Sequence, residues 1–222
     1  MNFQIVIPAR GGSKRFPGKN IALLNGIPLI AHSILYALKN KIGAEVFVNT
    51  DNKLIADVAK EFGAKIVERP SQYATDFTPT VDVLKHQVEY FEENGILCDA
   101  IILLQATNPL RATSLLQNAA NLFEKSGRNS LASYCVLNKK FGSISNKNFF
   151  SPKNYVPGQR MQDIEPLYFE DGCIYITNKT SILNNEIMTA DVYPLINTHF
   201  GARVDIDEKE DLALAEFLIK KE

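Results

Sequence analysis

Residues 3–20 read FQIVIPARGGSKRFPGKN. The run before the first glycine is rich in β-forming, apolar residues, and it ends at Pro8 and a pair of glycines. A short apolar run bounded in this way predicts a buried strand over residues 3–9. The polar segment that follows a buried strand is the usual place for a ligand in an α/β protein.

The segment after the predicted strand, residues 10–20, is basic and rich in glycine. It holds four basic side chains and no acidic one, namely Arg10, Lys14, Arg15 and Lys19. Backbone conformations that let N–H groups converge on an anion are open to its three glycines, Gly11, Gly12 and Gly18. Because ligands of open α/β sheets bind outside the carboxyl ends of the strands, this segment is predicted to bind phosphate, most simply a triphosphate.

Two better-known phosphate-binding loops do not fit this segment. A Walker A loop has four residues between its first glycine and Gly-Lys, and then Ser or Thr. Here five residues separate Gly12 from Gly18, and Asn20 follows Lys19. The dinucleotide pattern GxGxxG is also absent. The remaining alternative is a solvated basic turn whose glycines only reverse the chain.

Short apolar runs and helical periodicity alternate along the rest of the chain. Further strands are predicted over residues 45–49, 65–67, 100–104, 131–136, 173–177 and 202–206. Helices are predicted over residues 27–39, 52–62, 80–93, 114–124 and 208–220. This alternation predicts an α/β fold, with a mostly parallel sheet covered by helices on both faces. The 222 residues suit a single domain, residues 1–222.

Residues 138–170 interrupt the alternation. They are polar, rich in Asn, Ser, Lys and Pro, and they show little periodicity. A stretch of this length is often functional when it belongs to a folded domain, and its aromatic residues argue against plain disorder. We therefore expect either a long loop or a small protruding subdomain here.

Composition limits the possible partners and the location. The net charge is −1, from 24 basic and 25 acidic residues, so there is no bulk positive field for nucleic acid or an anionic membrane. The three cysteines include no CxxC pair, which suits a reducing compartment. The N-terminus does not have the pattern of a signal peptide, and no run is long enough for a membrane span. We expect a soluble, cytoplasmic protein.

Two carboxylates near the C-terminus form the candidate metal site. Asp205 and Asp207 lie two residues apart, and in a strand such residues face the same side. A carboxylate pair of this kind suits Mg²⁺, which prefers hard oxygen ligands and substrate phosphates. The alternative is structural, because Asp207 with Glu210 has the spacing of a capping box at a helix start.

The stretch from Pro8 to Asn20 resembles the signature of the acylneuraminate cytidylyltransferases. It is also similar, more broadly, to the sugar nucleotidyltransferases that include the 3-deoxy-manno-octulosonate enzymes. The resemblance implies a Rossmann-like, three-layer nucleotidyltransferase domain in which this loop cradles the phosphates of CTP. It implies nucleotide contacts from Arg10, Gly11, Gly12, Ser13, Lys19 and Asn20.

The resemblance runs nearly from end to end. Residues 68–70 and the helix start near residue 80 match segments beside the nucleotide, which implies roles for Arg69 and Thr80. Residues 103–111 and 162–175 match segments beside the sugar, which implies roles for Gln105, Thr107, Arg111, Arg160 and Tyr175. From the residues alone, Arg69 is as well explained as a surface charge, and Thr80 as an ordinary helix start. Asp51 has a counterpart in the family and is also a common helix N-cap.

The chain departs from the family pattern at several positions. Ala106 and Asn108 replace Pro and Ser, and Asp171 replaces the usual Asn. Met161 stands where the family often has the second of two basic residues. A lysine that some members use has no clear counterpart near residues 139–143. These departures are also compatible with a substrate preference that differs from that of the family.

The resemblance implies a cytidylyltransferase that joins CTP to an N-acylneuraminate and releases pyrophosphate. Arg10, Lys19 and Asp207 would serve the chemistry, with Mg²⁺ on Asp205 and Asp207. A homodimer is implied, with residues 138–170 as the exchanged element and Arg160 reaching the partner's site. The alternatives are a cytidylyltransferase for legionaminate, pseudaminate or an octulosonate, an enzyme using another nucleotide, and a non-catalytic nucleotide-binding protein on the same fold.

Overall fold

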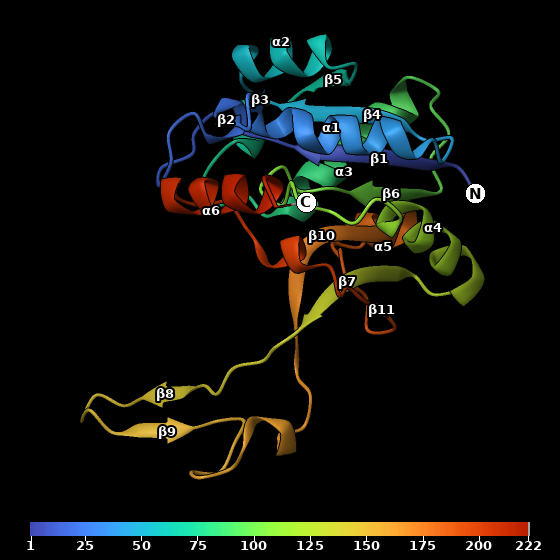
Figure 1. Ribbon diagram of the computed structural model, residues 1–222. Coiled ribbons are helices and arrows are strands. Elements are labelled where there is room, and N and C mark those ends of the chain that lie inside the picture. Colours follow the sequence, from blue (N-terminus) through green and yellow to red (C-terminus); the bar gives the residue numbers. More distant parts are fainter. Residues whose placement is uncertain (222) are drawn as a thin grey trace.

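A seven-stranded sheet forms the centre of the protein in the computed structural model, which describes residues 1–221 (Figure 1). Its strands, in the order β11-β7-β10-β6-β1-β4-β5 across the sheet, are Tyr193–Ile196, Ser130–Val136, Tyr168–Asn178, Ala100–Leu103, Phe3–Pro8, Glu45–Thr50 and Lys65–Glu68. Strand β10 runs antiparallel to β6 and β7, whereas β6, β1, β4 and β5 pair in parallel, as do β7 and β11. The prediction of a mostly parallel sheet is confirmed.

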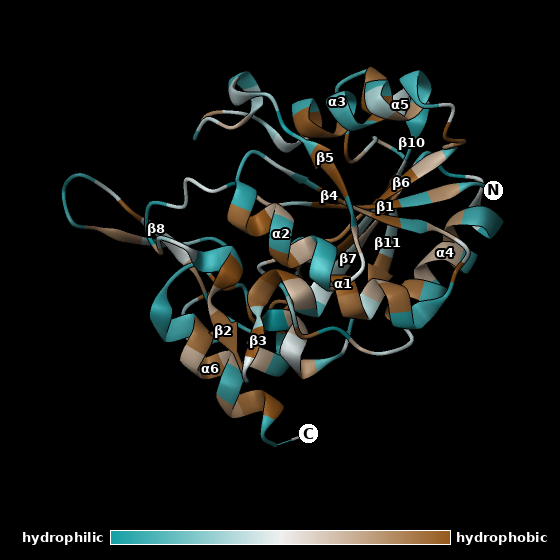
Figure 2. Ribbon diagram, turned by 90° about the horizontal axis from the view of Figure 1, so that it is seen from above, coloured by the Kyte–Doolittle hydropathy of each residue, from teal (hydrophilic) through white to brown (hydrophobic). Residues whose placement is uncertain are grey.

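Helices cover both faces of the sheet and give three layers. The helices are α1 to α6 in chain order, Leu29–Asn40, Lys53–Glu61, Thr80–Glu93, Leu115–Ser126, Lys179–Leu183 and Lys209–Ile219. Side chains of α1, α2 and α4 belong to one buried cluster, and those of α3 and α5 to another. Figure 2 shows the largely hydrophobic strands between α3 and α5 on one side and α1 and α4 on the other.

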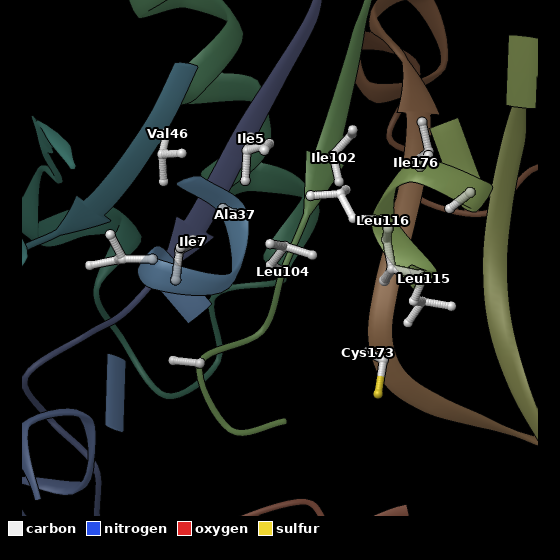
Figure 3. Close-up of a cluster of buried hydrophobic side chains, with 14 of the residues drawn as sticks. Ile5, Ile7, Ala37, Val46, Ile102, Leu104, Leu115, Leu116, Cys173 and Ile176 are labelled. Atoms are coloured by element: carbon white, nitrogen blue, oxygen red, sulfur yellow. The ribbon is translucent and has the colours of Figure 1, made fainter. Parts of the chain in front are cut away.

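The central strands are buried on both faces. Ile5 and Ile7 pack into the cluster below α1 and α4, whereas Val6 between them faces the cluster of α3. Figure 3 shows Ile5 and Ile7 beside Ile102 of the neighbouring strand β6 and Leu104, which directly follows that strand. Successive side chains of a strand point to opposite faces, so an uninterrupted apolar run is what a sheet covered on both sides requires.

The prediction of a strand over residues 202–206 is wrong. The segment begins as a 3₁₀ helix, Phe200–Arg203, and then passes over the loop that follows β6. It shares a backbone hydrogen bond with that loop, from Ile206 N to Thr107 O at 2.8 Å, but it does not join the sheet. The alternation is kept, because Val204 and Ile206 are buried in a third apolar cluster beneath α6, with Asp205 and Asp207 on the outer side.

Two short strand pairs lie outside the central sheet. Strands β2 (Leu23–Leu24) and β3 (Ile27–Pro28) form a tight hairpin before α1, and β8 (Gly142–Ile144) pairs with β9 (Phe150–Pro152). Neither hairpin was predicted. The edge strand β11 was also missed, because it is only four residues long and contains a proline, which sheets tolerate at an edge.

Residues 138–170 leave the body of the protein as an arm. The chain departs at the end of β7, forms the β8–β9 hairpin, and returns at the start of β10 (Figure 1). Several apolar side chains of the arm are exposed, with Ile144 at 72%, Phe149 at 70% and Val156 at 68%. Within residues 1–221, no helix combines the length and apolar character needed to cross a membrane.

Replacing Leu116 by alanine should lower the free energy of unfolding by about 2–5 kcal/mol, because it leaves a cavity in the core. Leu116 lies in α4 and is fully buried. Leu54→Ala is the matched control, since Leu54 also lies in a helix but is 62% exposed, and it should cost less than about 1 kcal/mol. Chemical denaturation measures both values, and equal losses would contradict the placement of Leu116 in the core.

Candidate active site

The loops after β1, β5 and β6 meet the segment before α6 in a cavity of about 470 Å³. These three strands run in parallel, so their carboxyl ends share one edge of the sheet, where ligands of such folds bind. The residues predicted for the site that line this cavity are Arg10, Ser13, Lys19, Asn20, Arg69, Thr80, Gln105, Thr107, Asp205 and Asp207. The structure therefore brings together residues that lie nearly 200 positions apart in the chain.

The two glycines after Arg10 shape the loop and do not line this cavity. A Cβ on Gly11 would lie 2.5 Å from Nδ2 of Asn52, so a side chain does not fit there. The Gly11 N–H donates to Asp51 Oδ1 at 3.0 Å. Asp51 thus anchors the loop, and the N-cap of α2 is Asn52, whose side chain accepts from the first turn. Gly12 has open space where its Cβ would lie.

The basic residues of the loop are paired with two aspartates. Lys19 Nζ lies 2.9 Å from Asp207 Oδ1, and Arg15 Nη2 lies 2.6 Å from Asp207 Oδ2. Arg10 Nη1 lies 2.6 Å from an oxygen of Asp76, and Lys14 also pairs with that aspartate; the loop containing Asp76 follows β5. The two carboxylates thus neutralise the cations that a phosphate chain would meet.

Arg69 supplies a fixed positive charge to the cavity wall. It is only 6% exposed, and its guanidinium donates to the side-chain and main-chain oxygens of Asn49 at 2.8 and 2.7 Å. Burial lowers the pKa of Arg69 to about 10, with Asp51 opposing the shift, so the side chain remains charged at neutral pH. Because Arg69 is buried, the alternative that it is only an exposed surface charge is excluded.

Asp205 and Asp207 differ in their protonation behaviour. Desolvation raises the pKa of Asp205, and the nearby charge of Asp207 adds to the rise, while a hydrogen bond from Thr107 opposes it. Desolvation also acts to raise the pKa of Asp207, but Lys19 and Arg15 outweigh it and lower the pKa. The two carboxylates repel each other across a short stretch of chain, which is the situation a divalent cation relieves.

A second cavity, of about 380 Å³, adjoins the first and shares Gln105 and Asp205 with it. Its lining also includes Tyr175, whose hydroxyl donates to Glu170 at 3.1 Å, and Arg203. Desolvation strongly raises the pKa of Tyr175, so the phenol stays protonated. The site is therefore two adjoining chambers, one lined by cations for phosphate and one with aromatic and polar walls.

Comparison with known proteins places the chain in a family. A family model described as cytidylyltransferase matches residues 4–222. The chain belongs to the cytidylyltransferase family. It is 34% identical over 228 residues to a CMP-N,N'-diacetyllegionaminic acid synthase of Legionella pneumophila, covering 99% of this chain and 97% of that relative. The family that the sequence resembled is thereby confirmed.

A second relative and a solved structure agree with the family. The chain is 30% identical over 214 residues to an N-acylneuraminate cytidylyltransferase of Streptococcus agalactiae, covering 93% of this chain and 50% of that relative. The fold resembles that of a CMP:2-keto-3-deoxy-manno-octonic acid synthetase complexed with CTP, with a TM-score of 0.73 and 19% identity. That comparison covers 100% of this chain and 99% of the other, and it supports the three-layer nucleotidyltransferase fold.

Arg111 and Arg160 do not line either cavity. Arg111 is buried, and its guanidinium donates to the backbone oxygens of Cys173 at 2.7 Å and Gln105 at 2.6 Å. These bonds hold the backbone of Gln105 in place, and the sugar contact predicted for Arg111 stays a prediction. Arg160 lies on the arm, where it forms two bonds to Asp163 at 2.7 and 2.9 Å.

Asp171 stands at the position where the resembling cytidylyltransferases carry Asn. Its carboxylate is buried, and it accepts from the Cys173 N–H at 2.9 Å, from Asn197 Nδ2 at 2.7 Å and from the Ser133 hydroxyl. A buried carboxylate needs such donors. The departure is thus accommodated inside the protein, at the irregular part of the β7–β10 pairing.

The acidic pair of this cytidylyltransferase has the donors that Mg²⁺ takes. Within residues 1–221, no group of three His, Cys, Asp or Glu side chains is placed to hold a metal ion. Asp205 and Asp207 offer two carboxylates on the cavity wall beside the basic loop. Mg²⁺ commonly binds one or two carboxylates and completes its shell with water and substrate phosphates. The residues therefore fit an ion held jointly by the protein and a phosphate ligand.

Several charged residues that line the two cavities were not predicted as site residues, among them Lys14 and Asp171. Asp76 and Glu170 lie outside the predicted set, and Arg203 precedes the acidic pair. Arg15 belonged to the basic loop but was not assigned a role. Local patterns gave no signal for Asp76 and Arg203, since each reaches its cavity only when segments remote in the chain meet.

Asp76→Asn should bind inorganic tripolyphosphate roughly two- to fivefold more tightly than the wild type, because the variant lacks a carboxylate that competes for two cations. Titration calorimetry at low ionic strength measures the affinity. Asp57→Asn is the control, since Asp57 pairs with Lys53 on the exposed face of α2. Unchanged or weaker binding by Asp76→Asn would show that Asp76 does not compete with phosphate.

Proposed function

We propose that the protein transfers the cytidylyl group of CTP to a nonulosonic acid, giving the CMP-sugar acid and pyrophosphate. The observation that carries the proposal is the meeting of the two cavities at Gln105 and Asp205. A cation-lined chamber beside an aromatic, polar chamber suits a triphosphate next to a sugar. The names of the two relatives, which are synthases of CMP-linked nonulosonic acids, support the same reaction.

The proposed reaction is a displacement at the α-phosphorus of CTP. The anomeric hydroxyl of the acid attacks that phosphorus, the bond to the β-phosphate oxygen breaks, and the hydroxyl proton leaves to solvent or a nearby base. Such a reaction needs positioning and charge neutralisation more than covalent catalysis. When bound by Asp205 and Asp207, Mg²⁺ would neutralise phosphate charge and polarise the hydroxyl.

The basic loop supplies the other half of the charge neutralisation. Lys19 and Arg15 would break their ion pairs with Asp207 and bind phosphate oxygens instead. Arg10 would likewise leave Asp76 for a phosphate oxygen. Each exchange replaces one charge pair by another, so the cations are already placed before the nucleotide arrives. Once released from Lys19, Asp207 is available to the metal. Lys19 and Arg10 would then stabilise the charge that develops on pyrophosphate.

The acceptor is proposed as an N-acylneuraminate or its N,N'-diacetyllegionaminate counterpart. The first follows from the sequence signature, and the second from the relative that matches along 97% of its own length. Gln105 and Tyr175 would shape the pocket for either acid, because both line the second cavity. The altered residues around Met161 and Asp171 make a direct comparison of acceptors necessary.

Purified protein with CTP and Mg²⁺ should release pyrophosphate only when a nonulosonic acid is added. Asp207→Asn should reduce the rate at least about 100-fold, because it removes a metal ligand and a partner of the basic loop. Asp57→Asn should keep the wild-type rate, since Asp57 lies on the exposed face of α2. The acids to compare are N-acetylneuraminate, N,N'-diacetyllegionaminate, pseudaminate and 3-deoxy-manno-octulosonate.

Each result has a distinct meaning. Release with one acid identifies the acceptor, and the highest kcat/KM ranks the four. Release of pyrophosphate with another nucleoside triphosphate, but not with CTP, would identify that nucleotide as the donor. No release with any acid or any of the four nucleotides would overturn the enzymatic proposal in favour of a nucleotide-binding protein.

We also propose that the arm, residues 138–170, joins two copies of the chain. A projecting hairpin with exposed Phe149 and Phe150 would leave much apolar surface in contact with water if the chain were alone. Pairing of two arms would cover these side chains. It would also carry Arg160 toward the second copy, as the family resemblance implies.

The wild-type protein should have the mass of two chains in light-scattering chromatography. Changing both Phe149 and Phe150 to serine should shift it to the mass of one chain, because apolar burial drives the association. Phe77→Ser is the control, since Phe77 is 92% exposed but lies in the loop after β5. A single-chain wild type, or a double variant that still dimerises, would contradict the proposed role of the arm.

A further inference from the structure

The second cavity contains an arginine for which the proposed reaction has so far given no role. Three of its lining residues are acidic, namely Glu170, Asp171 and Asp205. Arg203 is the basic residue among those that line it. An acidic chamber repels an anionic acceptor, so a ligand with a carboxylate needs this cation or a metal ion beside it.

The backbone of Arg203 is held firmly. It ends the 3₁₀ helix Phe200–Arg203, in which the Ala202 N–H donates to His199 O at 3.2 Å. Ala202 is buried, and a Cβ on the preceding Gly201 would lie 2.7 Å from Cβ of Leu110, so the backbone packs closely against the loop after β6. A side chain on such a backbone starts from a defined position.

Arg203 also faces the same side of the chain as the acidic pair. Val204 and Ile206 are buried, whereas Arg203 and Asp205 lie on the outer side. The same short segment thus presents a cation to the second cavity and a carboxylate to the junction of both cavities.

Arg203 belongs to none of the ion pairs formed within residues 1–221. Arg203 lies close enough to the Cys135 thiol to affect the pKa of that group. Burial raises the pKa of that thiol to about 11, Asp171 adds to the rise and Arg203 opposes it, so the thiol is neutral at pH 7. The loop cations, by contrast, are paired with Asp76 and Asp207.

We propose that Arg203 binds the carboxylate of the acceptor sugar acid and so selects acids over neutral sugars of the same shape. The inference rests on the proposed function. A guanidinium presents two parallel N–H groups to a carboxylate, which gives both strength and a fixed orientation. In a 2-keto sugar acid the carboxylate is attached to the anomeric carbon. A carboxylate bound to Arg203, two residues from Asp205, would therefore place that carbon near the point where the new bond forms.

The test compares the acid with its methyl ester in wild-type and Arg203→Ala proteins. Binding of each sugar is measured by titration calorimetry in the presence of Mg²⁺ and the non-reacting analogue α,β-methylene-CTP. Arg203→Ala should weaken binding of the acid about 10- to 100-fold, because a charge-assisted hydrogen-bonded pair is lost. The ester should bind both proteins alike, since it has no carboxylate charge to lose.

Three further readings separate this role from a structural one. KM for the acid should rise in Arg203→Ala while KM for CTP stays within about twofold, and Arg203→Lys should recover part of the loss. Arg128→Ala is the matched control, because Arg128 is exposed in the turn before β7, at the opposite edge of the sheet. Arg160→Ala, measured in parallel, tests whether the arm supplies the carboxylate contact instead.

The outcomes are distinguishable. If the wild type neither binds nor turns over any sugar acid, the proposed function fails and this inference fails with it. If the wild type is active but Arg203→Ala binds the acid as tightly as the wild type, the inference alone is overturned. An equal loss for the acid and its ester would also overturn it, because the effect would then not depend on the carboxylate.

Discussion

The ion pair between Lys19 and Asp207 joins the two ends of the chain and sets the geometry of the site. The Lys19 side chain is 11% exposed, so the pair is shielded from most of the solvent. It fixes the loop after β1 against the segment before α6, and Arg15 reinforces it on the other carboxylate oxygen. Four cations on one short loop would repel each other in an empty cleft. Pairing with Asp207 and Asp76 relieves that repulsion and leaves the cations where phosphate can exchange for the carboxylates.

The sheet explains why the site lies where it does. Strands β1 and β6 are parallel neighbours, so the basic loop and the loop holding Gln105 leave the same edge side by side. Strand β10 enters between β6 and β7 in the opposite direction, and its residues Glu170 and Tyr175 build the second cavity. Arg111 connects the loop after β6 to strand β10, because its guanidinium donates hydrogen bonds to the backbone oxygens of Gln105 and Cys173. The fold thus places two binding chambers in contact, and transfer of a group between two ligands requires that contact.

Much of the fold could be predicted from the sequence, because apolar periodicity reports which faces are buried. Helix α3 begins and ends at the predicted residues, and β1 differs only at its last position. The segment before α6 was wrongly predicted to be a strand, because buried and outward residues alternate in it although the chain only crosses a loop there. The basic loop and the acidic pair carried local chemical signals. Asp76 and Arg203 carried none, because their roles depend on cavities that form only when distant segments meet.

A crystal structure with CTP, and with Mn²⁺ in place of Mg²⁺, would show whether the loop cations and the two aspartates act together. We expect an anomalous metal peak at Asp205 and Asp207, with the triphosphate on the loop of residues 10–20. We also expect that Lys19 has moved from Asp207 to a phosphate oxygen. A nucleotide bound in this cavity while the Lys19–Asp207 pair stays intact and no metal lies at the two aspartates would contradict these expectations.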